Sequence, residues 1–386
     1  MNKKLLFNIT EDWFFCSHFL ERALSAKENG YSVYVISKEN KHRNTIENHG
    51  IIFYNLPFNR KSINPIYEFY IFLRIIYLYK KIKPDIVHHV ALKPIIYGSI
   101  AAKICKIKSV LNAPVGLGFV FSSETIKAKF LRPIIKFLLK RFLNSHLGIK
   151  KRNKVVFENF DDLNYFVEMG AVKTNSACVI RGAGVKVNSV IHKNKNKNKN
   201  KNSIVTITLV ARMLKDKGII EFVNAAKKIN INKVNGRFLL VGDADPFNPT
   251  SLDISTLQRW HDEKIIVWKG WVSDVDKILK ETDILCLPSY REGLPKALIE
   301  GAASGLPIVT TDTVGCRDVV EEGVNGFLVP IKNSDILASK IYKLIKNKSL
   351  REKMGKKSHD IALSKFSSTI IISQTLEVYD ELFFSK

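Results

Sequence analysis

Two glutamates and two cations form the pattern in this sequence that could do chemistry. Glu292 and Glu300 stand eight residues apart in the segment SYREGLPKALIEGAASGLP, and Arg212 and Lys217 stand upstream of them in ARMLKDKG. A carboxylate accepts hydrogen bonds from hydroxyl groups, whereas an arginine fork and a lysine point charge suit the oxygens of a diphosphate. We therefore expect the four side chains to gather around a ligand that carries both kinds of group.

The elements that must position these residues are strands and helices in alternation. Apolar runs rich in β-branched residues alternate with stretches whose apolar residues recur at helical spacing. Such strands are typical of parallel sheets covered by helices on both faces, so the sequence predicts an α/β protein with two doubly wound, Rossmann-like domains. The expected strands lie at residues 4–10, 31–37, 84–90, 154–159, 177–184, 203–210, 237–242, 264–270, 283–289 and 307–311, and the expected helices at 18–30, 218–230, 274–281 and 294–305.

Length and one low-complexity segment set the expected domain boundaries. The chain of 386 residues is too long for one ordinary core and fits two domains. The repeat KNKNKNKNKN at 193–202 has no apolar side chain to pack, so we expect a solvated linker, with a polybasic binding segment as the alternative. The expected N-terminal domain covers 1–190, the linker 191–203 and the C-terminal domain 204–366, and a last helix at 367–386 is expected to pack back on the first domain.

Ligands of open α/β sheets bind beyond the carboxyl ends of the strands. Arg212 follows the expected strand 203–210, and Lys217 comes directly before the glycine that opens the next helix. Glu292 follows the strand 283–289, and Glu300 lies about two turns into the next helix, whose first N–H groups can meet an anion. Taken singly, the glutamate pair could be a solvated helix face and Lys217 a surface lysine. Taken together, the four favour a diphosphate site.

These segments resemble the retaining glycosyltransferases of family 4, which have the GT-B fold. The resemblance rests on ARMLKDKG and on SYREGLPKALIEGAASGLPIVTTDTVGCRDVVEEGVNGFLVP, whose two glutamates match the Glu-x7-Glu motif of that family. It is strong over residues 204–330 and weaker before them, where HHVALKPIIYGSIAAK, NAPVGLGFVF and VVFENFDD resemble bacterial members that build surface polysaccharides. The resemblance implies two domains with parallel sheets that face each other across a cleft.

The resemblance also implies a role for each candidate residue. Arg212 and Lys217 would hold the pyrophosphate of the donor, Glu300 would accept hydrogen bonds from the ribose hydroxyls, and Glu292 would face the hydroxyls of the donor sugar. Six further residues would line the phosphate, the sugar, the nucleotide and its base: Gly293, Leu294, Pro295, Gly242, Trp271 and Val272.

The N-terminal half offers candidates for catalysis and for the acceptor side. His88 and His89 end the strand 84–90, and since adjacent strand residues face opposite ways, one of them is expected to reach the cleft. A core histidine is the alternative reading. Lys93 could meet a phosphate of the acceptor, and Gly116 and Gly118 are expected in a flexible loop at the cleft, or in a simple turn.

The sequence departs from the family pattern at two places. Many relatives have a glycine-rich turn after the first strand, but this chain reads ITEDWFFCSHF there, so the loop is expected to serve the acceptor instead of the donor. Relatives also often show Gly-Val-Asp at the entry to the linker, where this chain has Gly184, Val185 and Lys186.

Neither a metal nor another cofactor is expected. The pairs Asp243/Asp245 and Asp274/Asp276 imitate a carboxylate metal site, but we expect the first in a turn after a strand and the second at a helix start, where acids suit the dipole. Arg212 and Lys217 already provide positive charge for phosphates. The five scattered cysteines contain no CxxC pair, which indicates reduced thiols in a cytosolic protein.

The net charge of +25 favours anionic partners. No stretch reaches the roughly 20 apolar residues of a membrane span; the longest candidate, 69–79, is shorter and contains Arg74. Residues 126–152 hold nine Lys and Arg and no acid, with apolar residues at helical spacing, so we expect a helix that contacts an anionic membrane surface. A core-packed helix with a solvated basic face is the alternative. With no signal peptide expected, the predicted location is cytoplasmic, peripheral on the cytoplasmic face of the inner membrane.

The residues and the resemblance together predict a retaining glycosyltransferase. It would move a sugar from a nucleoside-diphosphate sugar, with UDP as the expected nucleotide, to a polyprenyl-diphosphate-linked or other lipid-linked saccharide in the synthesis of capsule, O-antigen or lipopolysaccharide. The alternatives are a UDP-sugar epimerase on the same fold and a basic nucleic-acid-binding protein. No nucleic acid is expected, because the cations do not alternate with aromatic residues. A glycoside hydrolase would also use two carboxylates, but it would leave Arg212 and Lys217 idle.

Overall fold

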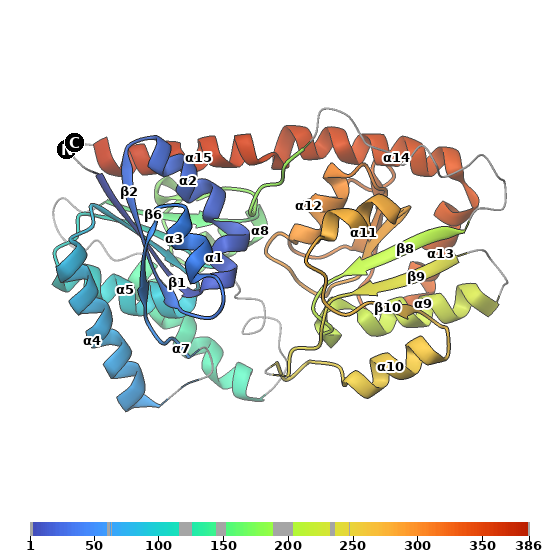
Figure 1. Ribbon diagram of the computed structural model, residues 1–386, viewed down its shortest axis with the longest axis horizontal. Helices are drawn as coiled ribbons and strands as arrows, with labels where there is room; N and C mark the ends of the chain where they lie inside the picture. Colours follow the sequence, from blue (N-terminus) through green and yellow to red (C-terminus); the bar gives the residue numbers. More distant parts are fainter. Residues whose placement is uncertain are drawn as a thin grey trace. The chain divides into compact units, whose positions relative to one another are not determined.

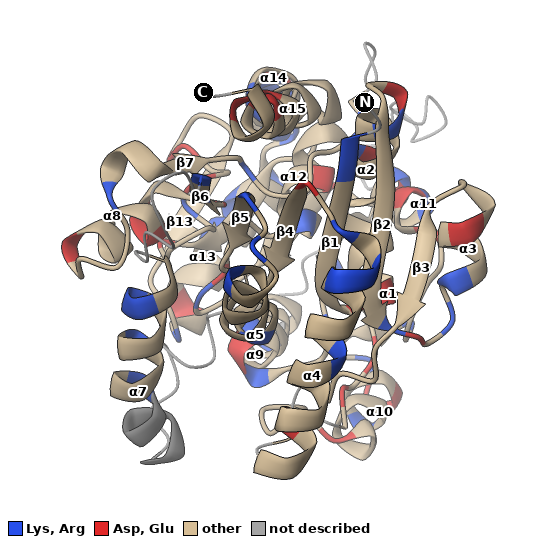
Figure 2. Cartoon of the chain, turned by 90° about the vertical axis from the view of Figure 1, so that its left-hand side faces the viewer, with Lys and Arg blue, Asp and Glu red and all other residues tan. Residues whose placement is uncertain are grey.

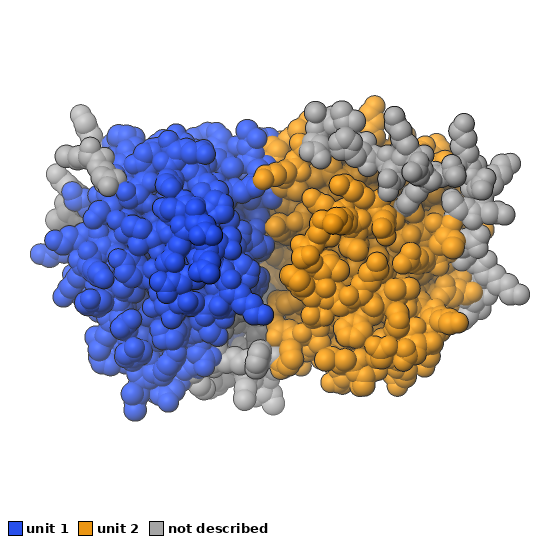
Figure 3. All heavy atoms as spheres, in the orientation of Figure 1, with its two compact units in different colours: residues 1–184, 368–386 blue, residues 185–367 orange. Residues whose placement is uncertain are grey.

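The computed structural model describes residues 3–59, 62, 64–115, 126–143, 152–187, 204–231, 236–246 and 248–384, with the backbone alone for 126–131 and 231. The chain forms two compact units (Figure 3). Unit 1 comprises residues 1–184 and 368–386, and unit 2 comprises residues 185–367. The expected linker at 191–203 lies outside the described residues.

Unit 1 is built on a parallel sheet of seven strands in the order β3-β2-β1-β4-β5-β6-β7 (Figure 1). The order reverses between β1 and β4, as in Rossmann-like folds. Its elements are β1 (Lys3–Glu11), α1 (Asp12–His18), α2 (Leu20–Glu28), β2 (Tyr31–Lys38), α3 (Arg43–Asn48), β3 (Ile52–Asn55), α4 (Pro65–Ile82), β4 (Ile86–Val90), α5 (Leu92–Ile104), β5 (Ser109–Ala113), α7 (Ile126–Leu143), β6 (Arg152–Phe157), α8 (Phe160–Glu168), η1 (Thr174–Ser176), β7 (Ala177–Val179) and α15 (Ser368–Phe384).

Helices cover both faces of this sheet. Phe7 of β1 packs in one core with Ala23 of α2 and Tyr379 of α15, whereas its neighbour Leu6 packs in a second core with Ile75 of α4. The two cores arise because successive strand residues point to opposite faces. The C-terminal helix α15 is tied to the start of β6 by Arg152, which donates to the carbonyl of Leu382 at 2.9 Å.

Unit 2 is built on a parallel sheet of six strands in the order β10-β9-β8-β11-β12-β13. The order reverses between β8 and β11, so these two central strands mark the ligand edge of the sheet. Its elements are β8 (Val205–Val210), η2 (Lys215–Lys217), α9 (Ile219–Ile231), β9 (Gly236–Val241), α10 (Ile254–Asp262), β10 (Val267–Trp268), α11 (Val275–Glu281), β11 (Ile284–Leu287), α12 (Lys296–Ala303), β12 (Ile308–Thr311), β13 (Gly326–Val329), α13 (Ser334–Lys346), α14 (Lys348–Ile361) and the π-helix η3 (Ala362–Phe366).

The two doubly wound parallel sheets confirm the predicted fold class, while several element boundaries differ from the prediction. The expected helix at 18–30 corresponds to α2, and a helix that was not predicted, α1, occupies the glycine-free segment after β1. The expected strand at 264–270 shortens to the two residues of β10, and the one at 177–184 to the three of β7. The strands β3, β5 and β13 were not predicted, because four or five residues give too little periodicity to recognise.

Candidate functional site

The candidate site of unit 2 lies where the sheet order reverses. Arg212 and Lys217 belong to the segment that follows β8, and Glu292 belongs to the loop that follows β11. The two strands are hydrogen-bonded neighbours, with Leu285 opposite Thr208. Because parallel neighbours end at the same edge, both segments leave the sheet side by side, where open α/β sheets bind ligands.

Backbone contacts lock these two segments together. The carbonyl of Asp216 accepts hydrogen bonds from the Tyr290 N–H at 2.9 Å and from the Ser289 hydroxyl at 3.1 Å. Gly218 ends the η2 turn with φ +71°, and a Cβ built there would lie 2.1 Å from the Pro288 carbonyl oxygen. Glycine is therefore required at 218 both by conformation and by space, and it holds Lys217 at a fixed place against the second loop.

Lys217 and Glu292 form an ion pair across the junction of the two segments. Their Nζ and Oε1 atoms lie 2.5 Å apart, and the side chains are 20% and 12% exposed. Because the pair is so little exposed, solvent screens it weakly, and the attraction between the two charges keeps both side chains in place. An anionic ligand that reached Lys217 would compete with Glu292 for the same ammonium group.

Arg212 is held by a residue that the sequence did not single out as its partner. Its Nη1 donates to Oδ2 of Asp245 at 2.7 Å, and the Arg212 side chain remains 46% exposed. Asp245 lies beyond β9, in the DAD turn that imitates a metal site, and its own N–H donates to the Ser251 hydroxyl at 3.0 Å. The only signal for this partner in the sequence was the acidic turn itself. The turn lies near Arg212 because β9 is the neighbour of β8 in the sheet.

Glu300 lies in the second turn of α12 and is largely buried. Burial raises the pKa of its carboxyl above the ordinary value, although Lys296, 3.4 Å away, opposes that rise. The helix begins after Pro295, and no side chain caps it. The start of α12 carries the positive end of the helix dipole.

The loop after β12 covers the segment that starts with Glu292. The N–H of Glu292 donates to the Val314 carbonyl at 3.1 Å, and a Cβ on Gly315 would lie 2.4 Å from the Gly293 carbonyl oxygen. Leu294 turns its side chain into the core of unit 2. Of Gly293, Leu294 and Pro295, only backbone atoms can therefore serve a ligand, as the family resemblance implies.

The predicted base-side residues cluster at the carboxyl ends of β9 and β10. Gly242 has φ +130°, and a Cβ there would lie 1.9 Å from the Ala211 carbonyl oxygen, so close packing alone demands glycine. Trp271 donates its backbone N–H to Asp243 at 2.9 Å, and the residue is 70% exposed. Val272 packs beside Val241 in a small cluster. Contact of these residues with a nucleotide stays a prediction.

The expectation that His88 or His89 reaches a cleft is wrong for both side chains. They do face opposite ways, but helices cover both faces of the unit 1 sheet, and the exposed fractions are 2% and 0%. His88 Nδ1 lies 2.9 Å from the Tyr379 hydroxyl, whereas the two ring nitrogens of His89 lie 2.9 Å from Tyr79 and Asn112. Burial lowers the pKa of His88 and lowers that of His89 to about 4, so both are neutral core residues.

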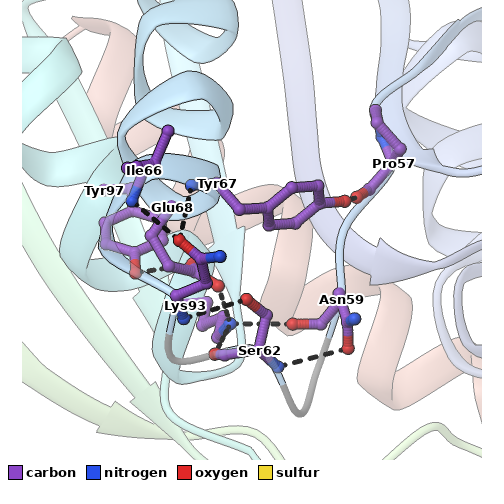
Figure 4. A network of polar contacts seen from close by, with 9 residues as sticks. Pro57, Asn59, Ser62, Ile66, Tyr67, Glu68, Lys93 and Tyr97 are labelled. Atoms are coloured by element: carbon purple, nitrogen blue, oxygen red, sulfur yellow. Dashed lines mark hydrogen bonds and ion pairs between the residues drawn. The ribbon is translucent and has the colours of Figure 1, made fainter.

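The ammonium group of Lys93 is engaged within unit 1, and its expected phosphate role stays a prediction. Its ammonium group donates to the carbonyls of Asn59 and Ser62 at 2.7 and 2.8 Å and to Glu68 at 2.6 Å (Figure 4). An ammonium has three N–H donors, so these contacts use all of them. Gly116 and Gly118 lie outside the described residues.

The basic helix α7 packs on one side, as in the alternative reading of its sequence, and its contact with a membrane stays a prediction. Leu139 and Leu143 are buried in a core with Ile95 of α5, so one side of the helix packs on unit 1. The other side exposes Phe137 and Lys140. Within the part of the chain that the structure describes, no helix is long and apolar enough to cross a membrane.

Unit 2 thus brings together groups that suit an anion and groups that suit hydroxyls. Lys217, Arg212 and the start of α12 provide positive potential, whereas Glu292 and Glu300 provide carboxylates for hydroxyl groups. Among the described residues, no group of three or more His, Cys, Asp or Glu side chains could hold a metal ion. Positive groups at fixed positions can stabilise a departing diphosphate electrostatically.

Comparison with known proteins places both units in one enzyme class. Residues 188–360 match the family described as Glycosyl transferases group 1, and residues 4–144 match the one described as Glycosyl transferase 4-like. The chain is 28% identical over 378 residues, 95% of each chain, to N,N'-diacetylbacillosaminyl-diphospho-undecaprenol alpha-1,3-N-acetylgalactosaminyltransferase of Campylobacter jejuni. It is 25% identical over 331 residues, 80% of this chain and 78% of the other, to UDP-Gal:alpha-D-GlcNAc-diphosphoundecaprenol alpha-1,3-galactosyltransferase of Escherichia coli.

Solved structures of the same fold include nucleotide complexes. Anabaena HepE in complex with UDP superposes with a TM-score of 0.76 at 17% identity, covering 98% of this chain and all of that one. Sucrose-phosphate synthase of Thermosynechococcus elongatus reaches a TM-score of 0.79 at 16% identity, covering 99% of both chains. These likenesses confirm the expected GT-B fold.

Proposed function

We propose that this chain, which matches the family of group 1 glycosyl transferases over residues 188–360, transfers a sugar from a nucleoside-diphosphate sugar to a lipid-linked saccharide in the synthesis of a cell-surface polysaccharide. UDP is the proposed nucleotide, because one relative is named for a UDP-galactose donor and a structural neighbour holds UDP. Polyprenyl diphosphate is the proposed carrier, because the names of these two relatives contain diphosphoundecaprenol or diphospho-undecaprenol acceptors.

The observation that carries this proposal is the junction of Lys217 with Glu292. It places a cation and a carboxylate 2.5 Å apart at the reversal point of the unit 2 sheet. In the proposed complex the donor diphosphate replaces Glu292 as the partner of Lys217, and Glu292 is released toward the sugar hydroxyls. Arg212 leaves Asp245 for the diphosphate in the same way, and Glu300 accepts the ribose hydroxyls.

The bond to the sugar breaks with the electron pair on the diphosphate oxygen. Lys217, Arg212 and the start of α12 stabilise the negative charge that develops there. The family that the chain resembles retains configuration, so the acceptor hydroxyl would attack on the face that the diphosphate leaves, and its proton would pass to a departing diphosphate oxygen. The basic helix α7 would hold the enzyme peripherally on the cytoplasmic face of the inner membrane, where anionic lipid attracts it.

The function is tested with purified full-length enzyme and a panel of UDP-, GDP- and ADP-sugars. Thermal unfolding identifies the nucleotide that stabilises the chain, and that sugar nucleotide is then incubated with and without a polyprenyl-diphosphate-linked saccharide. We expect UDP release and an elongated saccharide only when the acceptor is present. An isomerised sugar nucleotide without acceptor would instead identify an epimerase and overturn the proposal.

A further inference from the structure

Helix α4 (Pro65–Ile82) exposes a stripe of large apolar side chains. They recur at intervals of three and four residues, which places them on one side of a helix. The stripe residues are 47% to 82% exposed and comprise Ile66, Phe69, Tyr70, Leu73 and Tyr77. The other side of α4 is buried in the core of unit 1 through Ile71, Ile75, Leu78, Tyr79 and Ile82. The helix is therefore apolar on both sides, although one of them faces solvent.

The charges on the exposed side of α4 are all positive. Arg74, Lys80 and Lys81 are exposed beside the stripe. The single acid of the helix, Glu68, turns away, because Lys93 donates to it at 2.6 Å and the Tyr97 hydroxyl at 2.7 Å (Figure 4). The stripe thus lies among cations, and the one carboxylate of α4, Glu68, is neutralised by its contact with Lys93.

Helix α7, on the other side of α5 from α4, also exposes apolar and basic side chains. Both helices pack on α5 and begin at the carboxyl edge of the sheet, because they follow the parallel strands β3 and β5 (Figure 2). Helix α7 exposes Ile134 and Phe137, and its sequence holds no acid. Figure 2 shows Lys and Arg along its described turns.

We propose that α4 inserts its apolar stripe into the surface of an anionic lipid bilayer. Apolar and tyrosine side chains among cations are the composition of a helix that lies in a membrane interface. A second copy of this chain fits the stripe less well, since a net charge of +25 makes two copies repel each other. The inference rests on the proposed function and adds to it: α4, besides the basic charges of α7, docks unit 1 where a lipid-linked acceptor is presented.

The test is flotation of the full-length protein with vesicles of equal parts phosphatidylglycerol and phosphatidylcholine. The variant I66N/F69N/L73N changes three exposed stripe residues, and the variant I254N/I336N/L363N changes three exposed apolar residues of unit 2 as a control. Removing three inserted side chains should weaken partitioning by at least about tenfold, because each buried methylene contributes to binding. The control should bind as the unaltered protein does. Equal binding of the stripe variant and the unaltered protein would overturn the proposal.

Three further measurements distinguish an anionic membrane from a neutral one and from a second copy of the chain. Vesicles of phosphatidylcholine alone should bind more weakly than the anionic ones, and added salt should weaken binding to the anionic ones. Analytical ultracentrifugation should show the same sedimentation for the unaltered protein and the stripe variant. A dimer that the stripe substitutions dissociate would instead assign the stripe to a second copy.

Measurements of sugar transfer distinguish a failure of the docking role from a failure of the proposed function. The stripe variant should keep its transfer rate on a short-chain acceptor in solution and lose rate on the same saccharide carried by a full-length polyprenol in vesicles. An enzyme that transfers sugar equally well in both settings, with or without the stripe, would contradict the docking role alone. An unaltered protein that binds vesicles but transfers no sugar would contradict the proposed function and leave the docking role standing.

Discussion

Lys217 Nζ lies 2.5 Å from Glu292 Oε1, although 75 residues separate them along the chain. The contact exists because β8 and β11 are neighbours at the reversal point of the unit 2 sheet, and because the Asp216 carbonyl ties the two following segments together. An ion pair at this place presents a cation and a carboxylate to the same ligand. The proposed donor site depends on that relationship.

Substituting either cation should reduce transfer while the fold is kept. We expect Lys217→Ala or Arg212→Ala to lower kcat/KM by an amount equivalent to about 2–5 kcal/mol, because each removes a charged partner of the diphosphate. The matched control is Lys215→Ala, an exposed lysine of the same η2 turn. Near-normal kcat/KM for Lys217→Ala would contradict the diphosphate role.

Glu292→Gln should separate donor binding from transfer. The substitution removes the carboxylate that competes with a phosphate for Lys217, so the affinity for UDP should be kept or increased. The rate of sugar transfer should fall, because the sugar hydroxyls lose their acceptor. Calorimetry with UDP and steady-state kinetics measure the two effects. A loss of UDP affinity as large as that of Lys217→Ala would refute this division of roles.

Glu300 should make donor binding depend on pH. Burial raises the pKa of its carboxyl, and ribose hydroxyls bind better to the ionised form. UDP affinity should therefore weaken as the pH falls through this raised pKa, at a higher pH than for an ordinary glutamate. Stability without ligand should show the opposite sign, because a raised pKa favours the folded state at low pH.

Calorimetric UDP titrations over a pH series measure this effect. In Glu300→Gln the affinity should be lower at neutral pH, and this acid limb should be absent. An unchanged pH profile in that variant would show that another group is responsible.

His89 should make unit 1 less stable in mild acid. Its pKa is about 4 in the folded chain and about 6.5 when unfolded, so the unfolded chain binds more protons between these values. The stabilisation is complete above the unfolded pKa and is lost as the pH falls toward 4, by up to about 3 kcal/mol. Urea unfolding at several pH values should show this loss in the unaltered protein and a smaller one in His89→Gln. The same pH dependence in both would exclude His89 as its source.

Removal of divalent metal should leave transfer intact. Lys217 and Arg212 provide the positive charge that a divalent ion would otherwise supply to a diphosphate. We expect equal initial rates in a chelator and in added Mg²⁺. An enzyme that the chelator inactivates and Mg²⁺ restores would contradict this prediction.

The sequence predicted the parts of the site that depend on pattern and not those that depend on packing. Arg212, Lys217 and Glu292 follow long apolar runs, and parallel strand order brings the ends of such runs together. The pairing of Arg212 with Asp245 was missed, because it depends on which strand neighbours β8. The burial of His88 was missed because its covering residue, Tyr379, comes from the far end of the chain.

The most direct test is a crystal structure of the full chain with UDP bound. We expect diphosphate oxygens within hydrogen-bond distance of Lys217 and Arg212, with Glu292 and Asp245 released from these cations and the ribose hydroxyls bound to Glu300. A diphosphate bound elsewhere, with the Lys217–Glu292 and Arg212–Asp245 pairs still closed, would contradict this expectation.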